Sequence, residues 1–370
     1  MADMVYLDWN ATAPLRPEAR AALIGALDHI GNPSSVHGFG RRARRLVEDA
    51  REQVAALAGA SPAQVTFTGG GTEANNQALA LAGDKRRLLV GATEHASVLE
   101  VRADAVAVPV DGDGLIDSAA LAALLAADSQ PALVSIQAVN NETGVIQDMA
   151  SLAAIVHAHG GWLHSDAVQA AGRIPIDMAA WGCDLLSLSA HKIGGPHGVG
   201  ALLAVAGIPL APLLRGGGQE RRMRAGTENV AGIAGFGAAC AASLAGLADY
   251  AALSLLRDRL ETAVLALAPT AQIIGAGAPR VANTSCIALP GVPANSQLMA
   301  FDLAGIAVSA GSACSSGKVK SSHVLRAMGL EEALAGAAIR VSLGWDSTEA
   351  DIDRFIACWD RIAARTRPAA

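Results

Sequence analysis

The sequence contains few aromatic and few charged residues. Aromatic side chains account for 3% of its 370 residues and charged ones for 17%, whereas 52% of the residues are hydrophobic. This composition excludes a disordered chain, because the apolar surface suffices to offset the conformational entropy lost on folding. The formal net charge of −6 at pH 7 argues against a nucleic-acid or anionic-membrane partner, since binding either needs a basic surface. We expect a compact protein, and its length predicts two domains.

Cysteine is also scarce, and the five cysteines lie far apart without a C-x-x-C pair. This spacing indicates neither a disulfide framework nor a structural zinc site. Cys314 lies among small and polar neighbours in SAGSACSSGKVKSS, as expected of an exposed loop. The others have apolar surroundings and are interpreted as small core residues, namely Cys183, Cys240, Cys286 and Cys358.

Targeting and membrane-spanning segments are not indicated. The N-terminal MADMVYLDWN has no cationic region followed by an apolar run, so we expect no secretory signal and a cytoplasmic location. The most apolar stretch, Ala231 to Ala248, is nearly all alanine and glycine and predicts a core helix. The basic cluster from Arg41 to Arg45 precedes Glu48 and Asp49 at helical spacing, which favours a solvated helix face.

Three histidines, His157, His159 and His164, lie close enough in sequence to raise the question of a metal site. Their surroundings have the pattern of an ordinary helix and strand, so we interpret them as structural. No resident metal is expected.

Seven short β-type runs alternate with Ala/Leu-rich stretches of helical period from about residue 64 onward. The runs are QVTFT, RRLLVGA, AVAVPV, ALVSIQAV, GWLHSD, DLLSLSA and GVGALLAV. This alternation predicts an α/β fold with a mainly parallel seven-stranded sheet flanked by helices. NTSCIALPG and the C-terminal RVSLGWDSTEADIDRFIACWDRIAAR suggest a smaller α+β domain. We assign residues 16–250 to the large domain, and residues 1–15 and 251–370 to the small one.

Two polar residues lie at expected strand ends, where ligands of such sheets bind. Lys192 follows the run DLLSLSA and is a candidate imine-forming amine, although a lone lysine is more often a solvated surface residue. Asp166 ends the run GWLHSD, and Gln169 follows three residues later. A carboxylate near such a lysine is the pairing that pyridoxal phosphate needs, because it keeps the pyridine nitrogen protonated. A helix N-cap is the alternative for Asp166.

A glycine-rich turn from Thr68 to Thr72 follows the strand VTFT and opens an expected helix. Glycines let the backbone approach an anion, and the helix N-terminus favours a phosphate. The turn matches neither the Walker nor the GxGxxG pattern, so it indicates a phosphate site of unspecified kind.

Ten motifs, read together, carry a resemblance over nearly the whole chain. They are YLDWNATAP, GNPSSVHGFGR, GGGTEANN, TEHASV, VNNETGVIQD, HSDAVQAAG, SLSAHKIGGPHGVGAL, GGGQERRMRAGTENV, SAGSACSSGKV and IRVSLG. Because it contains these motifs in this order, the chain resembles the cysteine desulfurases of the NifS/IscS group. These belong to the class V aminotransferase family of fold-type I pyridoxal-phosphate enzymes. The resemblance implies that fold, with the large domain binding the cofactor and the small domain carrying the cysteine loop.

The resemblance implies roles for the residues around the cofactor. Lys192 would hold it covalently and later move protons at the substrate α-carbon, while Asp166 would pair with the pyridine nitrogen. His95 would stack on the ring, Gln169 would bind the phenolic oxygen, and Asn141 would lie near that oxygen and the substrate carboxylate. The phosphate would be held by Gly71, Thr72, Ser189 and His191, and by Thr227 from the other subunit of a homodimer.

The resemblance also implies a substrate and a reaction. Arg340 would bind the carboxylate of L-cysteine as a bidentate guanidinium, with Asn32 close by. The Cys314 thiolate would take the substrate sulfur as a persulfide and leave L-alanine, with Lys318 and Lys320 favouring the thiolate.

The fate of the sulfur also follows from the resemblance. The SAGSACSSG loop resembles that of the group linked to iron-sulfur cluster assembly, so transfer to a scaffold or another acceptor protein is expected, or use in tRNA thiolation. Cys314 would then serve at most as a transient cluster ligand. The chain stops soon after the last expected helix with AARTRPAA, so the extension that grips the scaffold in some relatives is expected to be short.

Two other functions remain open from the sequence. A selenocysteine lyase or another enzyme of the class V aminotransferase family would use the same lysine and aspartate without the cysteine. A non-catalytic sulfur-carrier protein would retain the fold, but the joint presence of Lys192, Asp166 and Arg340 argues against it. A nicotinamide-dependent dehydrogenase is less favoured, because its glycine fingerprint is missing.

Overall fold

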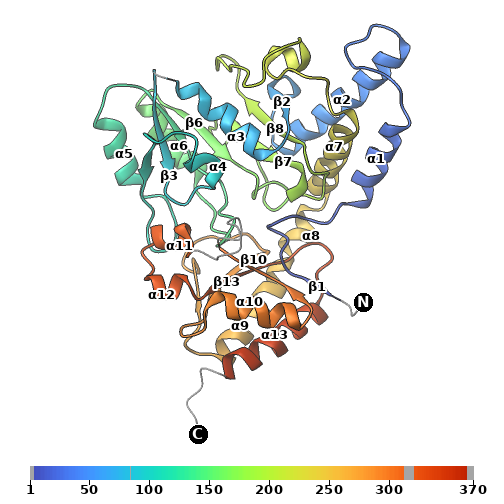
Figure 1. The fold of residues 1–370 in the computed structure, drawn as a ribbon. Coiled ribbons are helices and arrows are strands. Elements are labelled where there is room, and N and C mark those ends of the chain that lie inside the picture. Colours follow the sequence, from blue (N-terminus) through green and yellow to red (C-terminus); the bar gives the residue numbers. More distant parts are fainter. Residues whose placement is uncertain (1–3, 84, 312–320, 365–370) are drawn as a thin grey trace.

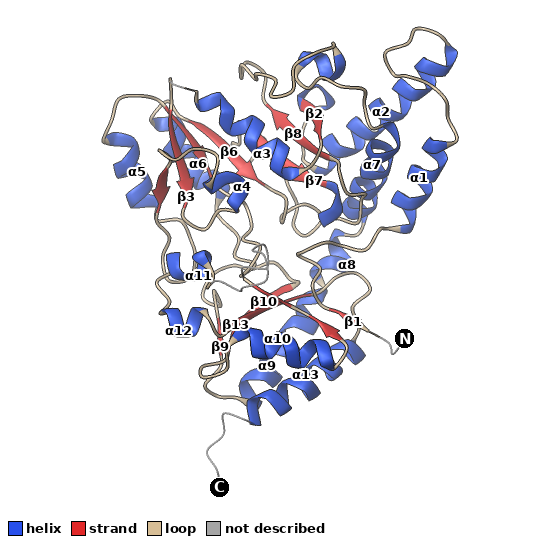
Figure 2. Ribbon diagram, in the orientation of Figure 1, coloured by secondary structure: helices blue, strands red, loops and turns tan. Residues whose placement is uncertain are grey.

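The computed structural model describes residues 4–83, 85–311 and 321–364. In the upper half of the view, helices cover a large sheet. A smaller group of strands and helices lies below it (Figures 1 and 2). Cys314, Lys318 and Lys320 lie outside the described residues.

The large sheet confirms the predicted seven strands. In order across the sheet they are β2 (Val65–Thr68), β8 (Gly200–Ala204), β7 (Leu185–Ser189), β6 (Trp162–Asp166), β5 (Ala132–Ser135), β3 (Arg87–Gly91) and β4 (Val106–Val108). β8 runs antiparallel to both neighbours, and the other pairs are parallel. The parallel strands therefore end at one common edge.

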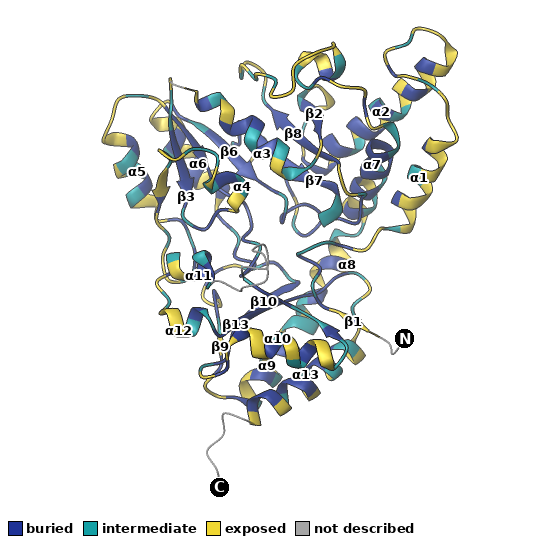
Figure 3. Cartoon of the chain, in the orientation of Figure 1, coloured by how far each residue is buried: buried dark blue, intermediate teal, exposed yellow. Residues whose placement is uncertain are grey.

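Each face of this sheet has its own core, because successive strand residues point to opposite sides. Leu185 packs with residues of α3 and α4 on one face, whereas its neighbour Leu186 packs with α2, α5, α6 and α7 on the other. Figure 3 shows the strands buried between these helix layers. The helices of this part are α1 (Pro17–Leu27), α2 (Gly38–Leu57), η1 (Pro62–Gln64), α3 (Gly71–Leu79), η2 (Ala80–Ala82), α4 (Ala96–Leu99), α5 (Ser118–Ala126), α6 (Met149–Ala158), η3 (Ala190–Lys192), η4 (Gln219–Arg222), α7 (Val230–Ala245) and α8 (Leu247–Ala251).

Local sequence signals explain where several helices begin. Pro17 occupies the first turn of α1, where its missing N–H costs no hydrogen bond. The Asp117 side chain accepts hydrogen bonds from the first amides of α5. Thr348 and Asp351 form a reciprocal capping box at the start of α13 (Glu349–Ala363).

The smaller part is built around an antiparallel sheet of β12 (Ser309–Ala310), β13 (Ala338–Ser342), β10 (Thr284–Ala288) and β9 (Gln272–Ile273). The N-terminal β1 (Val5–Tyr6) pairs with β11 (Ile306–Ala307) in parallel. Val5 and Leu7 lie in one core with Phe301 and Phe355, whose rings stack with centroids 4.6 Å apart. The helices here are α9 (Leu253–Leu267), α10 (Ala294–Leu303), α11 (His323–Ala327), α12 (Glu332–Ala335) and α13 (Glu349–Ala363).

Other sequence predictions are confirmed in the described part of the chain. The four cysteines expected in the core are buried. Arg44 and Arg45 on α2 pair with Glu48 and Asp49. The alanine-rich stretch forms α7, which packs against α1 and α2.

Across residues 4–83, 85–311 and 321–364, no single helix has the length and apolarity needed to cross a membrane. The bent pair of α7 with Leu247–Leu267 meets those criteria only when both parts are taken together.

The three histidines also have structural partners, and His159 Nδ1 lies 3.0 Å from the Ile155 carbonyl oxygen. His164 is fully buried and bridges the Ser135 and Ser187 hydroxyls at 2.8 Å each. His157 contacts Asp184 at 2.9 Å. The described residues contain no group of three or more potential metal ligands.

Candidate active site

The common edge of the parallel strands gathers most of the predicted cofactor residues. Asp166 ends β6, Ser189 ends β7, and His95 follows β3 by a short loop. Asp166 and Lys192 both lie close enough to His95 to affect its pKa. Residues far apart in sequence therefore meet because the strands before them run parallel in one sheet and end on the same side.

Lys192 is the last residue of the 3-10 turn η3, which directly follows β7. Its Nζ donates to the carbonyl oxygens of Asn10 and Ala11 at 2.6 and 2.8 Å. Burial, and after it the positive charges of Arg340 and Arg173, lowers the pKa of the ammonium to about 7. A buried amine that is partly neutral at pH 7 is a nucleophile suited to imine formation.

Asp166 is held by neutral donors. It is 8% exposed, and its carboxylate accepts from Asn75 Nδ2 at 2.7 Å and from the backbone N–H of Val168 at 3.0 Å. The Val168 bond lies in a turn, so the N-cap alternative does not describe it. Neutral donors orient a carboxylate without cancelling its charge, which leaves that charge for a cationic ring nitrogen.

His95 has a fixed ring orientation at the start of α4. Its Nδ1 accepts from the Ser97 amide at 3.1 Å and lies 2.9 Å from the Ser97 hydroxyl. Burial lowers the pKa of the imidazole, which therefore favours its neutral form. A neutral ring held in one orientation can stack on another flat ring.

The surrounding residues fit pyridoxal phosphate. Gln169 Nε2 donates to the Asn10 carbonyl at 3.0 Å, whereas its Oε1 is buried with no partner among the described residues. A Cβ on Gly71 would lie 3.1 Å from Val168 Cγ2 and 3.3 Å from Ser189 Cβ. The absence of a side chain at position 71 therefore leaves a small space beside Ser189, which we call the cradle. α3 has no side-chain N-cap in front of Gly71, and its first amides can bind an anion.

Two other residues predicted to bind the phosphate, Thr72 and His191, lie close in sequence to Gly71 and Ser189. Thr72 is exposed in the first turn of α3. The His191 ring stacks on His197 with centroids 5.2 Å apart, and its Nδ1 lies 3.3 Å from Thr12 Oγ1. Burial lowers the pKa of His191 to about 4, so its ring is neutral at pH 7.

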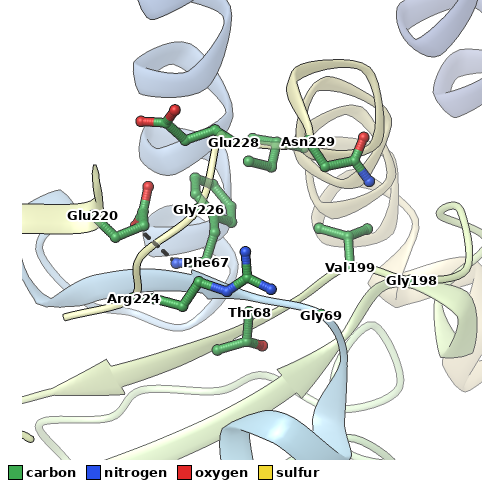
Figure 4. A pocket seen from close by; sticks show the side chains of 11 residues that line it. Phe67, Thr68, Gly69, Gly198, Val199, Glu220, Arg224, Gly226, Glu228 and Asn229 are labelled. Atoms are coloured by element: carbon green, nitrogen blue, oxygen red, sulfur yellow. Dashed lines mark hydrogen bonds between the residues drawn. The ribbon is translucent and has the colours of Figure 1, made fainter. Parts of the chain in front are cut away.

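Thr227 is exposed in the segment between η4 and α7, next to a pocket that borders the glycine turn at Gly69 (Figure 4). Arg224 in this pocket pairs with Glu73 of α3 at 3.0 Å. Both carboxylate oxygens of Glu228 are buried with no partner among the residues described. The structure therefore places the RAGTEN segment beside the turn that opens α3.

Arg340 on β13 faces the same centre from the smaller sheet. It is 6% exposed, and it donates to Asp8 Oδ1 at 2.7 Å and to the Asn141 carbonyl at 3.0 Å. Its Nε is buried with no partner in the described chain. Asn141 thus lies against the arginine predicted to bind the substrate carboxylate.

Asn32 is not brought to this cluster. Its Oδ1 accepts from the Ser34 amide at 2.8 Å in the connection between α1 and α2. Figure 1 shows that connection at the upper right, whereas β13 lies in the lower half.

Sequence reasoning missed the part played by the N-terminal segment Asp8–Thr12. Asn10 and Ala11 accept from Lys192, and Asp8 pairs with Arg340. The polar residues of YLDWNATAP were a signal. However, two of these contacts use backbone carbonyls, which side-chain patterns do not reveal.

Comparisons with known proteins agree with this geometry. Residues 5–355 match the family model described as Aminotransferase class-V. A protein called "Cysteine desulfurase" from Cereibacter sphaeroides is 46% identical over 368 residues, covering 96% of this chain and 94% of the relative. An "IscS-like cysteine desulfurase" from Mycobacterium tuberculosis is 40% identical, with coverage of 99% and 98%.

Solved structures are similar too. The X-ray structure of a NifS-like protein from Rickettsia africae ESF-5 matches with a TM-score of 0.92 and 37% identity, covering 98% of this chain and 100% of that one. The family match, the relatives and the strand-end cluster agree, and the chain belongs to the class V aminotransferase family.

Proposed function

We propose that this protein is a pyridoxal-phosphate-dependent cysteine desulfurase that moves the sulfur of L-cysteine to Cys314 and releases L-alanine. One observation carries this proposal: the half-buried Lys192 amine, whose pKa is lowered to about 7, lies at the strand-end edge that also holds Asp166. The relatives named as cysteine desulfurases support the reaction.

Pyridoxal phosphate, when bound, withdraws electrons from the substrate α-carbon. Lys192 would hold it covalently, Asp166 would pair with its ring nitrogen, and Gln169 and His95 would bind the ring oxygen and the ring face. Its phosphate would contact Gly71, Thr72, Ser189 and His191, and Thr227 of a second copy in a homodimer.

The protein residues then orient the substrate and move its atoms. Arg340 binds the substrate carboxylate beside Asn141. The Cys314 thiolate attacks the substrate sulfur, so that an S–S bond forms as the C–S bond breaks. Lys192 would first take the α-proton, and the carbon fragment keeps the electron pair of the broken C–S bond. Protonation of this fragment, with Lys192 returning the proton at the α-carbon, gives L-alanine.

The persulfide requires an acceptor. Supply of sulfur for iron-sulfur cluster assembly, through a scaffold protein, or for tRNA thiolation fits the loop type, with Cys314 at most a transient cluster ligand. We also propose a cytoplasmic location and the division into residues 16–250 and residues 1–15 with 251–370. That division follows the core that Val5 and Leu7 share with Phe301.

L-Alanine formation from L-cysteine tests the function directly. Cys314→Ser is expected to abolish turnover, whereas Cys183→Ser changes only a buried thiol and serves as the control. Unchanged turnover in Cys314→Ser would contradict the desulfurase mechanism and would favour a selenocysteine lyase or another member of the family.

A further inference from the structure

Glu142 connects two segments that lie far from it in sequence. It belongs to the Asn-Asn-Glu turn after β5, and its side chain is 2% exposed. The Ser322 hydroxyl, itself buried, donates to Glu142 Oε2 at 2.5 Å. The same hydroxyl accepts from the Leu325 amide at 3.2 Å and caps α11. A buried carboxyl therefore fixes the residue at which α11 begins.

Gly311 meets the same carboxyl from the other direction. It follows β12, and a Cβ built on it would lie 2.1 Å from Glu142 Oε2 and 2.8 Å from Ser322 Cβ. A side chain at position 311 cannot fit unless these atoms move. Gly311 and Ser322 flank residues 312–320, which include Cys314 and which we call the Cys314 segment.

The turn that carries Glu142 is itself fixed to the active site. The Glu142 amide donates to Asn140 Oδ1 at 2.8 Å, and Asn140 Nδ2 donates to the Thr93 carbonyl at 3.2 Å. The neighbouring Asn141 carbonyl accepts from Arg340. Glu142 is therefore rigid relative to the groups proposed to bind substrate.

We propose that Glu142 is a positioning residue that holds both ends of the Cys314 segment in register with the substrate site. This inference rests on the proposed function of Cys314. Gly311 and Ser322 adjoin the Cys314 segment in sequence on its two sides, and misplacing a reacting group by about 1 Å can cost about 100-fold in rate. Glu142 acts on sulfur transfer through Gly311 and Ser322 and touches no substrate atom.

Single-turnover kinetics test the proposal. In Glu142→Ala and in Ser322→Ala, we expect sulfur to appear on Cys314 about 10 to 100 times more slowly, while the Kd for L-cysteine changes less than about twofold. Glu142→Gln keeps a carbonyl oxygen for Ser322 and should restore most of the rate. Glu261→Gln, in the ion pair with Arg280, is a matched control expected to transfer sulfur normally.

Thermal unfolding of the unloaded protein gives a second readout. Gly311→Ala should lower Tm in the wild-type background and lower it less in Glu142→Ala, because part of the clash is then relieved. Equal losses in both backgrounds, or a normal transfer rate in Glu142→Ala, would overturn the proposal, and so would weakened L-cysteine binding as the main defect. Absence of sulfur on Cys314 in the wild-type protein would instead overturn the proposed function.

Discussion

The large-sheet edge and the smaller sheet form their halves of the site in different ways. At the large sheet, Asp166 ends β6, Lys192 follows β7 and His95 follows β3, so the parallel pairing within one sheet sets their spacing. At the smaller sheet, Arg340 depends on Asp8, which lies 332 residues away in sequence. The difference indicates that cofactor binding and substrate binding can be perturbed separately.

The largest expected effect falls on the large-sheet edge. Lys192→Ala should lower L-alanine formation by at least about ten-thousand-fold, because the cofactor-holding amine is lost. The visible absorption of the bound cofactor should disappear with it, as spectroscopy of the purified variant would reveal. If the variant kept both its colour and its turnover, the amine would have no place in the chemistry.

Damage to the smaller core should spare the cofactor. Phe355 is fully buried against Phe301, and Phe355→Ala should cost about 3–5 kcal/mol of unfolding free energy, measured by urea titration. The absorption of the bound cofactor should persist below the transition, while L-cysteine binding weakens. Simultaneous loss of the absorption in the folded variant would show that the two halves do not act separately.

A milder change in the smaller sheet should act on substrate affinity alone. Arg340→Lys removes the planar pair of donors and should raise KM for L-cysteine about 10- to 100-fold, with the cofactor spectrum unchanged. Asp8→Asn keeps the shape of the carboxylate that orients Arg340. This variant should also raise KM for L-cysteine, by a smaller factor. Steady-state kinetics of both variants would test this, and a fall in kcat at unchanged KM would contradict it.

The effect that is smallest at neutral pH concerns the interior of the large sheet. Burial lowers the pKa of His164 from 6.5 to about 3, so between these values the folded state binds fewer protons than the unfolded one. Its contribution to stability is complete above pH 6.5 and is lost as pH falls toward 3. Unfolding free energies measured over this range should fall less steeply in His164→Gln, and an identical slope would show that the histidine is not buried in its neutral form.

Sequence reasoning predicted the large sheet better than the connections around it. All seven strands were identified, because each has a short apolar run that ends at a glycine, aspartate or serine turn. Their pairing order, and the antiparallel direction of β8, depend on contacts between distant segments and could not be predicted from single runs.

The site divides in the same way. Asp166 and Lys192 were candidates because both lie at expected strand ends, and the resemblance carried by the ten motifs assigned their roles. The contacts of Lys192 with Asn10 and Ala11 use backbone carbonyls, and Glu142 meets Ser322 across 180 residues. No local pattern encodes such contacts, since they exist only after both parts have folded.

Mass spectrometry of the protein after L-cysteine is added without reductant tests the central claim most directly. We predict one added sulfur atom on the peptide that contains Cys314, and none on that peptide in Lys192→Ala. An unmodified Cys314 in the wild-type protein with its cofactor bound, or sulfur on Cys314 without Lys192, would contradict the account.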